Sequence, residues 1–389
     1  MKHDLKVPVA NGAMQSIVLN APAQFKTATL GMVLPRKALS AAHVVCDPHI
    51  DVVPFAHSAI DMDATQRYRE YLWSLGLGVA EAMDTAQRGM GLSWGDAQEL
   101  IAETLHRARG LPGAEVYSGV GTDHLPAEEM PLSRVVEAYQ SQLEFVETRG
   151  GRVILMASRA LSASAKSYED YSFVYREVLS AARQPVILHW LGPMFDPALT
   201  GYWGEHDLER AMSRCLDVIH EHADKVEGIK ISLLDKTLEI EMRRRLPAGV
   251  SMFTGDDFNY PELIAGDGAS HSDALLGIFD PIAPAASAAL RALGDQDTQT
   301  FRATLDPTVA LAREIFRAPT QYYKTGVVFL AWLNGHQEHF TMVGGHQGAR
   351  SILHLSRVFA LANDCGLLSH PEMARERMRI LLELHGVWQ

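Results

Sequence analysis

The segment Val226–Leu234 contains a single lysine, Lys230, at the centre of an apolar run rich in β-branched residues. Side chains alternate along an extended strand, so Lys230 and Ser232 share one face while Ile229 and Ile231 share the other. If both faces of the strand are covered, the lysine is desolvated, and desolvation favours the neutral amine. A neutral amine attacks a carbonyl carbon and forms a Schiff base. The pattern therefore indicates a catalytic nucleophile; the alternative is a lysine at the strand end whose amine reaches solvent.

The elements that would position this lysine follow a regular alternation from about Ala41 onward. Short apolar runs are followed by longer stretches of helical period, which is typical of parallel βαβ units. Eight such runs favour a (β/α)8 barrel, an α/β fold, over an open doubly wound sheet, which periodicity alone leaves possible. The predicted strands are His43–Cys46, Leu77–Ala80, Glu115–Val120, Val153–Ala157, Val186–His189, Gly228–Ser232, Ser251–Thr254 and Ala274–Phe279.

Three regions are predicted along the chain. Residues 1–40 form an N-terminal arm or hairpin, with short apolar runs at Ser16–Leu19 and Ala28–Val33. Residues 41–280 form the barrel, and residues 281–389 form a C-terminal helical extension that packs on the barrel or contacts another subunit.

Composition excludes some functions. The 389 residues carry a net charge of −12 and no extended basic run, which argues against a nucleic-acid partner. The three cysteines are odd in number and far apart, so they predict neither a disulfide framework nor a cysteine-based zinc site. The chain starts without a signal-peptide pattern, and no run approaches 18 apolar residues, so a cytoplasmic protein without a membrane partner is expected.

Further polar residues follow the predicted strands, at the end of the barrel where active sites form. His189 ends the fifth strand and suits a general acid/base, or else forms a hydrogen bond beneath a loop. Asp256 and Asp257 follow the seventh strand and could bind substrate hydroxyls or a cation, although at least one of them suits a helix N-cap. Arg159 follows the fourth strand and could clamp a carboxylate or phosphate, or simply lie at the surface.

Carboxylates also follow the second strand. Glu81 and Asp84 are candidates for binding hydroxyls or acting as a base.

Histidines and aspartates cluster after the first predicted strand and could hold a metal. The cluster comprises His43, Asp47, His49, Asp51 and His57. No His-x-His pair occurs in it, and the chain has no His-Glu-x-x-His motif. A divalent metal held by His43 and Asp47 is therefore the lesser alternative.

Four short motifs resemble those of the dihydrodipicolinate synthase and N-acetylneuraminate lyase family of class I aldolases, over roughly Ala41–Phe316. They occur in the family's order, on the corresponding predicted strands. They are Gly119-Val120-Gly121-Thr122, Pro185-Val186-Ile187-Leu188-His189, Gly228-Ile229-Lys230 and Gly255-Asp256-Asp257. The resemblance implies that Lys230 forms the Schiff base, that no cofactor is needed beyond this lysine imine, and that the protein is a homo-oligomer.

Departures from the family pattern indicate a divergent branch and put pyruvate as the donor in doubt. The family's proton-relaying tyrosine on the fifth strand is replaced by His189, and its paired threonines after the second strand have no clear match. The loop at 191–206 is longer and rich in aromatic residues. Trp190 at its start, Thr122 and Ser232 are candidate substrate-binding residues.

The sequence thus predicts a Schiff-base lyase, an aldolase or dehydratase, acting on a small polar oxo acid or oxo sugar. A second hypothesis is a metal-dependent barrel isomerase or hydrolase that uses His43, Asp47, His189 and Asp256. A third is a barrel without catalytic activity that serves binding or assembly.

Overall fold

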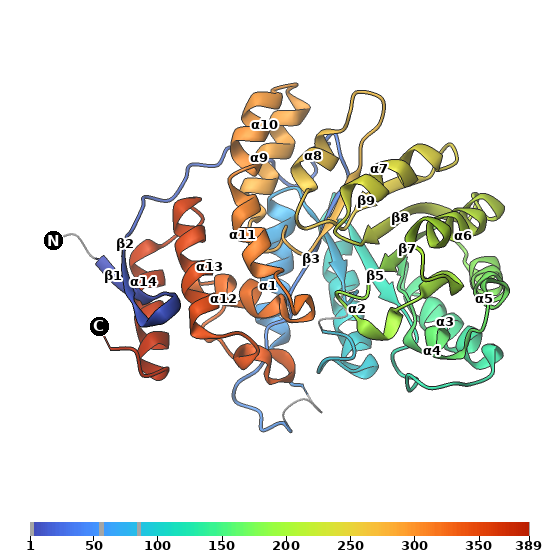
Figure 1. Cartoon of the computed structure of the whole chain (residues 1–389), viewed down its shortest axis with the longest axis horizontal. Helices are drawn as coiled ribbons and strands as arrows, with labels where there is room; N and C mark the ends of the chain where they lie inside the picture. The colour runs from blue at the N-terminus through green and yellow to red at the C-terminus, as the bar shows by residue number, and fades with distance from the viewer. Residues whose placement is uncertain (1–3, 54–57, 84–86, 389) are drawn as a thin grey trace.

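The computed structural model describes residues 4–53, 58–83 and 87–388, and it contains a closed barrel of eight parallel strands (Figure 1). The strands follow chain order around the barrel, and the last one closes it by pairing with the first. They are β3 (Ala38–Ala41), β4 (Gly78–Glu81), β5 (Val116–Val120), β6 (Arg152–Leu155), β7 (Val186–Leu191), β8 (Val226–Ser232), β9 (Ser251–Thr254) and β10 (Asp273–Leu276). The predicted (β/α)8 barrel is confirmed.

The first barrel strand differs from the prediction. The predicted strand His43–Cys46 lies beyond β3, which ends at Ala41. All residues from Ala38 to Cys46 are buried, so their apolar character does not mark where the strand ends. His43 consequently lies in the loop at the carboxyl end of β3 rather than within the strand.

Helices surround the barrel on its outer side (Figure 1). Two of them are capped by aspartates: Asp207 accepts a hydrogen bond from Arg210 N, and Asp235 accepts from Thr237 N and Leu238 N. Such caps satisfy amide groups that the first helical turn leaves without partners. The helices are α1 (Met62–Ser74), α2 (Trp94–Arg109), α3 (Leu132–Glu147), α4 (Arg159–Ser164), α5 (Tyr168–Ala181), α6 (Leu208–Glu221), α7 (Lys236–Arg245) and α8 (Tyr260–Ala265).

The barrel interior is filled by a cluster of side chains separate from the core beneath the helices. Alternate residues of each strand point inward, so the two cores come from opposite faces of the same strands. The inner cluster comprises Leu39, Ala41, Ala80, Met83, Tyr117, Ile154, Met156, Ile187, Phe253 and Leu275.

The amino-terminal end of the barrel is closed by charged groups. Lys37 Nζ donates to Tyr117 Oη at 2.8 Å and forms an ion pair with Glu227 at 2.6 Å. These groups lie at the end of the barrel opposite the strand ends that carry the candidate site.

A C-terminal extension of six α-helices confirms the predicted helical tail. The extension comprises α9 (Ala283–Gly294), α10 (Thr298–Leu305), α11 (Thr308–Ile315), α12 (Lys324–Leu333), α13 (Ile352–Asp364) and α14 (Pro371–Leu384). Among the described residues, no helix has both the length and the apolar character needed to cross a membrane.

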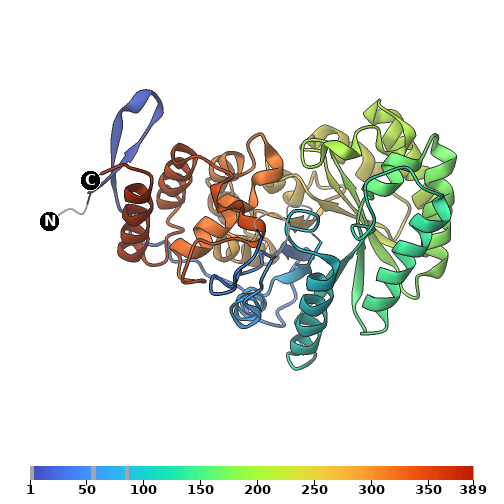
Figure 2. The ribbon, with the colours of Figure 1, turned by 90° about the horizontal axis from the view of Figure 1, so that it is seen from below.

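The N-terminal hairpin packs on this extension rather than on the barrel. Strands β1 (Asp4–Pro8) and β2 (Met14–Val18) pair antiparallel, and β1 contacts α13 and α14 (Figure 2). Asn20 N donates to Asn363 Oδ1 at 2.8 Å, and Asn363 Nδ2 donates to Val18 O at 3.1 Å. The predicted run Ser16–Leu19 thus overlaps β2, whereas its partner strand is Asp4–Pro8 and 28–33 contains no strand.

Candidate functional site

Lys230 lies on the inner face of β8, where strand alternation placed it. Ile229 and Ile231 belong to the outer core under the helices, whereas the Lys230 residue is 7% exposed and points to the interior. Gly228, two residues earlier on the same face, lies against the Phe253 ring, which a Cβ at Gly228 would approach to 2.6 Å. The Lys230 side chain therefore lies above a closely packed layer of the barrel interior and extends toward the carboxyl ends of the strands.

A glycine that directly follows the neighbouring strand β9 leaves room for this lysine. A Cβ at Gly255, just after β9, would lie 2.7 Å from Lys230 Cε and 2.3 Å from Ser232 Oγ. Both separations are far shorter than a van der Waals contact. The absence of a side chain at Gly255 thus allows the lysine and the serine to occupy the mouth together.

His189 projects inward from β7, in register with Lys230 on β8. Its Nε2 lies 3.1 Å from Ser232 Oγ, and its Nδ1 is buried with no hydrogen-bond partner among the described residues. Burial, reinforced by the charge of Lys230, holds the pKa of His189 well below 6.5. The ring is therefore neutral near pH 7 and can accept a proton.

The two aspartates after β9 accept hydrogen bonds from different segments of the chain. Asp256 accepts hydrogen bonds from Phe258 N at 2.8 Å and Asn259 N at 3.0 Å, and it stabilises the turn that leads into α8. Asp257 is buried, and its Oδ1 accepts from Ile278 N at 2.8 Å, which ties the end of β9 to the loop after β10. Asp256 thus stabilises the start of a helix, which was the predicted alternative to substrate binding for at least one of the two aspartates.

Thr122 and Arg159 lie at the ends of β5 and β6. The Thr122 and Ser158 hydroxyl oxygens are 2.6 Å apart, and Ser158 caps α4, the helix that begins with Arg159. Arg159 Nε is 2.6 Å from Asp196 in the loop after β7, and its side chain is 32% exposed. Arg159 thus fastens that loop and still presents part of its guanidinium to solvent.

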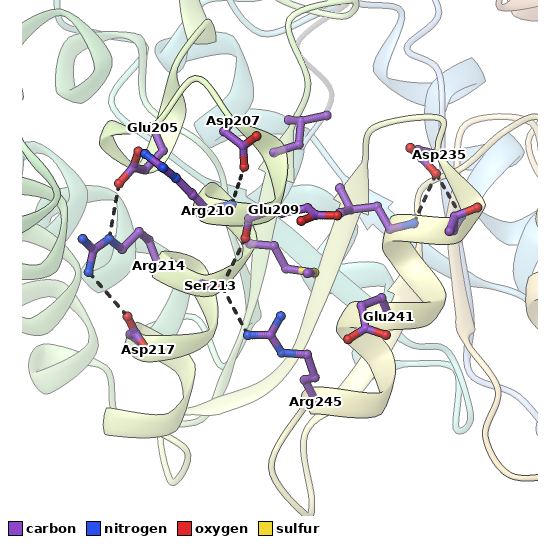
Figure 3. A pocket seen from close by; sticks show the side chains of 14 residues that line it. Glu205, Asp207, Glu209, Arg210, Ser213, Arg214, Asp217, Asp235, Glu241 and Arg245 are labelled. Atoms are coloured by element: carbon purple, nitrogen blue, oxygen red, sulfur yellow. Dashed lines mark hydrogen bonds and ion pairs between the residues drawn. The ribbon is translucent and has the colours of Figure 1, made fainter.

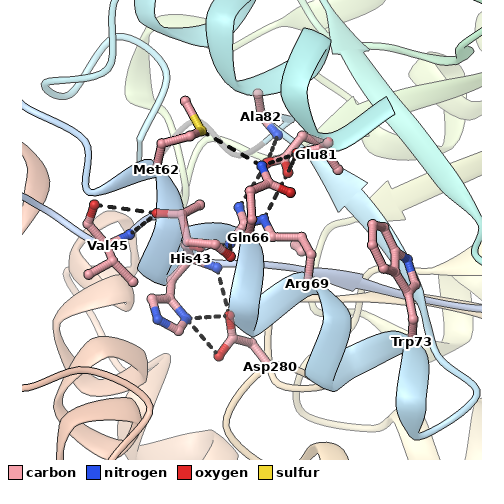
Figure 4. Close-up of polar contacts among 12 residues, drawn as sticks. His43, Val45, Met62, Gln66, Arg69, Trp73, Glu81, Ala82 and Asp280 are labelled. Atoms are coloured by element: carbon pink, nitrogen blue, oxygen red, sulfur yellow. Dashed lines mark hydrogen bonds and ion pairs between the residues drawn. The ribbon is translucent and has the colours of Figure 1, made fainter. Parts of the chain in front are cut away.

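Two predicted substrate-binding residues point away from the barrel interior. Both Glu81 carboxylate oxygens form 2.8 Å hydrogen bonds with Arg69, and Thr104 also donates to Glu81, so this carboxylate lies between β4 and the helices (Figure 4). Trp190 points to the opposite face of β7 from His189. Its ring packs at right angles to that of Trp203, with ring centroids 6.5 Å apart. Strand alternation explains both placements, and Asp84 lies outside the described residues.

The residues of the metal hypothesis are not brought together. His43 is fully buried, and its Nδ1 is 2.9 Å from Asp280 Oδ2 (Figure 4). Asp47 is partly exposed and accepts a hydrogen bond from His49 N at 2.8 Å. No group of three or more potential metal ligands occurs within 4–53, 58–83 and 87–388, and His57 lies outside these ranges.

A large groove lies on the outer wall of the barrel, between α6 and α7 (Figure 3). Its volume is about 1050 Å³, and polar contacts join several of the side chains that line it. Arg214 pairs with Glu205 at 3.5 Å, and Arg245 donates to Ser213 Oγ at 3.2 Å. The groove contains none of the predicted site residues, so its size does not make it the candidate site.

A family model described as "Protein of unknown function (DUF993)" matches residues 5–387. The chain belongs to this family. No curated protein matches the sequence.

Solved structures with the same fold include members of the dihydrodipicolinate synthase family. The chain is similar to YagE from E. coli K12, a member of that family crystallised with pyruvate, at a TM-score of 0.63 and 11% identity, covering 91% of this chain and 100% of that one. It is also similar to dihydrodipicolinate synthase from Aquifex aeolicus, at a TM-score of 0.59 and 13% identity, covering 90% and 98%. The enzyme from Bacillus clausii matches at a TM-score of 0.62 and 14% identity, covering 84% and 97%. The resemblance is thus confirmed for the fold, on a strongly divergent sequence.

Sequence reasoning missed several residues at the carboxyl end of the barrel. Asp280 and Lys324 are both buried there, and each comes from a segment beyond the eighth strand. Lys324 opens the otherwise apolar helix α12, and a charge at the start of such a run is the signal that could have identified it. Asp280 has no comparable signal, because an aspartate followed by proline reads as a turn.

Proposed function

We propose that this protein is a lyase that forms a Schiff base between Lys230 and an oxo substrate. The observation that supports the proposal is the buried lysine on the inner face of β8, with a neutral histidine in register on the next strand. A (β/α)8 barrel reacts at the carboxyl ends of its strands, which is where both side chains point.

The proposed reaction starts when the Lys230 ammonium gives up a proton to solvent water and the resulting amine adds to the substrate carbonyl. The resulting carbinolamine loses water and becomes an iminium ion, which withdraws electrons from the neighbouring carbon. In a substrate with a hydroxyl group on the β-carbon, the C–C bond then breaks. Its electron pair forms an enamine, the hydroxyl proton passes to a base, and an aldehyde departs. Protonation of the enamine carbon and hydrolysis of the iminium by water return the product ketone and the free amine.

His189 is the base in this proposal because its ring is held neutral beside the lysine. It would take the hydroxyl proton and return it to the enamine carbon, with Ser232 orienting the ring through the 3.1 Å contact at Nε2. Dehydration uses the same lysine and the same iminium. His189 would take a proton from the α-carbon to give the enamine and pass it to the β-hydroxyl group, which the enamine expels as water to leave an unsaturated iminium. Aldol cleavage and dehydration are therefore two versions of one proposal.

Borohydride trapping tests this function. The protein is incubated with a panel of small oxo acids and oxo sugars, reduced with borohydride, digested and mapped by mass spectrometry. We expect a stable secondary amine on Lys230 with at least one compound, and no adduct at that position in Lys230→Met. Lys37→Met is the matched control, because Lys37 lies at the opposite end of the same barrel in an ion pair with Glu227. If no carbonyl compound in the panel modifies Lys230, the lyase proposal is wrong.

Two expectations remain alongside this proposal. The homo-oligomer implied by the family resemblance stays a prediction, as does the cytoplasmic location. If instead chelation abolished an activity that a divalent metal restored, the metal-dependent hypothesis would replace the lyase.

A further inference from the structure

A cluster of arginines lies between two helices of the C-terminal extension, α11 and α13, which pack against each other (Figure 1). Its centre is Glu314, near the end of α11. Glu314 Oε1 accepts hydrogen bonds from His354 Nδ1 at 2.8 Å and from Arg357 Nε at 3.0 Å, both on α13. Arg317 Nε is 3.4 Å from the same oxygen. One carboxylate oxygen thus gathers three nitrogen-bearing side chains from two segments of the chain.

A third arginine of this cluster, Arg350, is buried. It lies just before α13 and is 7% exposed, and its guanidinium donates to Arg317 O at 2.7 Å and to Pro319 O at 2.9 Å. Its Nε has no hydrogen-bond partner among the described residues, and the ion pairs of the cluster within this part of the chain all go to Glu314 from other side chains. Burial and the neighbouring charge of Arg317 both lower the pKa of Arg350. Because a buried charge is costly without an opposite charge beside it, Arg350 favours an anion nearby.

His354 adds no charge of its own to the cluster. Burial, followed by the charges of Arg350, Arg317 and Arg357, lowers the pKa of His354 to about 3. The ring is therefore neutral near pH 7, although it donates a hydrogen bond to Glu314, and its buried Nε2 has no partner within the described ranges. Three guanidiniums consequently face one carboxylate, which leaves the cluster with a net charge of +2.

The outer ends of two arginines are open to an incoming anion. Arg317 and Arg357 both approach Glu314 through Nε, and their terminal nitrogens form no hydrogen bond with the residues that the structure describes. Each of the two side chains is 39% exposed. A guanidinium presents its N–H groups as a planar fork that matches the oxygens of a phosphate. Since both forks extend from one carboxylate oxygen, they are close enough together to bind the same anion.

We propose that Arg317, Arg350 and Arg357 form a binding site for a phosphate group, separate from the barrel site of Lys230. The terminal nitrogens of Arg317 and Arg357 would donate to the phosphate oxygens, and the buried charge of Arg350 would attract the anion without a direct bond. The net charge of +2 balances a phosphate dianion. The cluster also lies at the amino end of α13, where the helix dipole favours negative charge. The group could belong to inorganic phosphate or to a phosphate monoester.

Phosphate binding is measured by titration calorimetry at constant ionic strength with the wild type, Arg317→Gln, Arg357→Gln and Arg214→Gln. Arg214 on α6 is the matched control, because its side chain is 41% exposed and pairs with Glu205 outside the extension. We expect inorganic phosphate to bind the wild type and Arg214→Gln equally and to bind the other two variants at least tenfold more weakly. Equal affinity in all four proteins overturns the site, as does the lack of saturable binding to the wild type. Thermal melting without phosphate shows that each variant is folded.

Glu314→Gln gives a result that a merely structural role of the arginines would not produce. The amide oxygen can still accept hydrogen bonds from His354 and Arg357, but the negative charge that competes with the anion is gone. We therefore expect Glu314→Gln to bind phosphate more tightly than the wild type does. An affinity equal to or below that of the wild type overturns the site, because the arginine charges would then not act on the anion.

Further ligands identify the class and the source of the anion. Acetate, a monovalent carboxylate, should bind at least tenfold more weakly than inorganic phosphate, and equal binding overturns the assignment to phosphate. If glycerol 3-phosphate binds as tightly as inorganic phosphate, the site takes a phosphate monoester; if it is rejected, the site takes the free anion.

Lys230→Met separates this site from the proposed lyase. We expect Lys230→Met to bind phosphate as the wild type does, whether or not Lys230 forms an imine. Loss of phosphate binding in Lys230→Met would place the anion in the barrel and overturn the site in the extension. Failure of borohydride trapping with retained phosphate binding would leave this site standing and the lyase wrong.

Discussion

Gly255 lies directly against Lys230, and a methyl group at its Cα would come within 2.7 Å of Lys230 Cε. The same methyl would lie 2.3 Å from Ser232 Oγ, so neither neighbour could keep its position. The proposed nucleophile therefore depends on a glycine that directly follows the neighbouring strand β9.

Gly255→Ala is expected to abolish borohydride trapping on Lys230 while the protein still folds. Crowding of a closely packed site costs about 1–3 kcal/mol, which a protein of ordinary stability tolerates. Gly348→Ala is the control, because a Cβ at Gly348 meets nothing within 4 Å. Unchanged trapping in Gly255→Ala would mean that the lysine does not need its observed position.

His189→Asn is expected to separate imine formation from turnover. Lys230 remains available, so trapping persists, but the rate of the full reaction should fall by about 10²–10⁴ because the proton carrier is lost. Trapping yield and steady-state rate are measured on the same preparations, with His106→Asn on the exposed side of α2 as the control. Equal turnover in both variants would remove His189 from the mechanism.

The depressed pKa of His189 also predicts how stability changes in acid. Between the lowered pKa of the folded protein and 6.5, the unfolded chain binds a proton that the buried ring does not. Stability should therefore fall as the pH drops below about 6.5, and the fall should be shallower in His189→Asn. Urea unfolding at pH 5.5 and pH 7.5 measures the difference; parallel slopes in the two proteins contradict it.

The raised pKa of Glu239 predicts that the free energy of unfolding falls as the pH rises. Burial raises the pKa of Glu239 to about 8, from 4.5 in the unfolded chain, and its oxygens accept hydrogen bonds from Thr254 and Ser272. Between these two values the folded protein holds a proton that the unfolded chain has released, so stability should decline as the pH rises. Glu239→Gln should flatten that decline and unfold at higher denaturant concentration than the wild type at pH 8.5. A variant that is less stable at both pH 6 and pH 8.5 would show that the carboxyl is not protonated.

The Arg69–Glu81 pair predicts a loss of stability rather than of substrate binding. Both side chains are fully buried, so Glu81→Ala leaves an uncompensated guanidinium and should cost about 3–5 kcal/mol. The double variant Arg69→Met, Glu81→Leu removes both charges and should recover most of that loss. The denaturant midpoints of the wild type, Glu81→Ala and the double variant measure these changes. If Glu81→Ala were as stable as the wild type, Glu81 would again be a candidate for substrate binding.

The inward direction of several site residues was predictable because side chains alternate between the two faces of a barrel strand. Alternation along 226–234 placed Lys230 and Ser232 inward, and the same rule applied to His189. Alternation did not predict the direction of Glu81, because both faces of β4 are buried and the sequence does not show which face points into the barrel. It failed again at His43, where burial continues past the end of β3.

Other features could not be predicted because they depend on contacts between distant segments. Lys324 reaches Ala41 across 283 positions of the chain, and no local pattern encodes that approach. The role of Gly255 likewise depends on the side chains of β8, although the glycine itself was visible as part of a motif. Placing such residues requires the closed barrel and the path of the extension over it.

The bonds from Val18 and Asn20 to Asn363 have a consequence for synthesis. The hairpin packs against α13 and α14, so this packing must wait until both helices have left the ribosome. Until then, Leu5, Val7 and Ile17 have no apolar surface to cover them. The hairpin is therefore synthesised well before the helices that hold it in place.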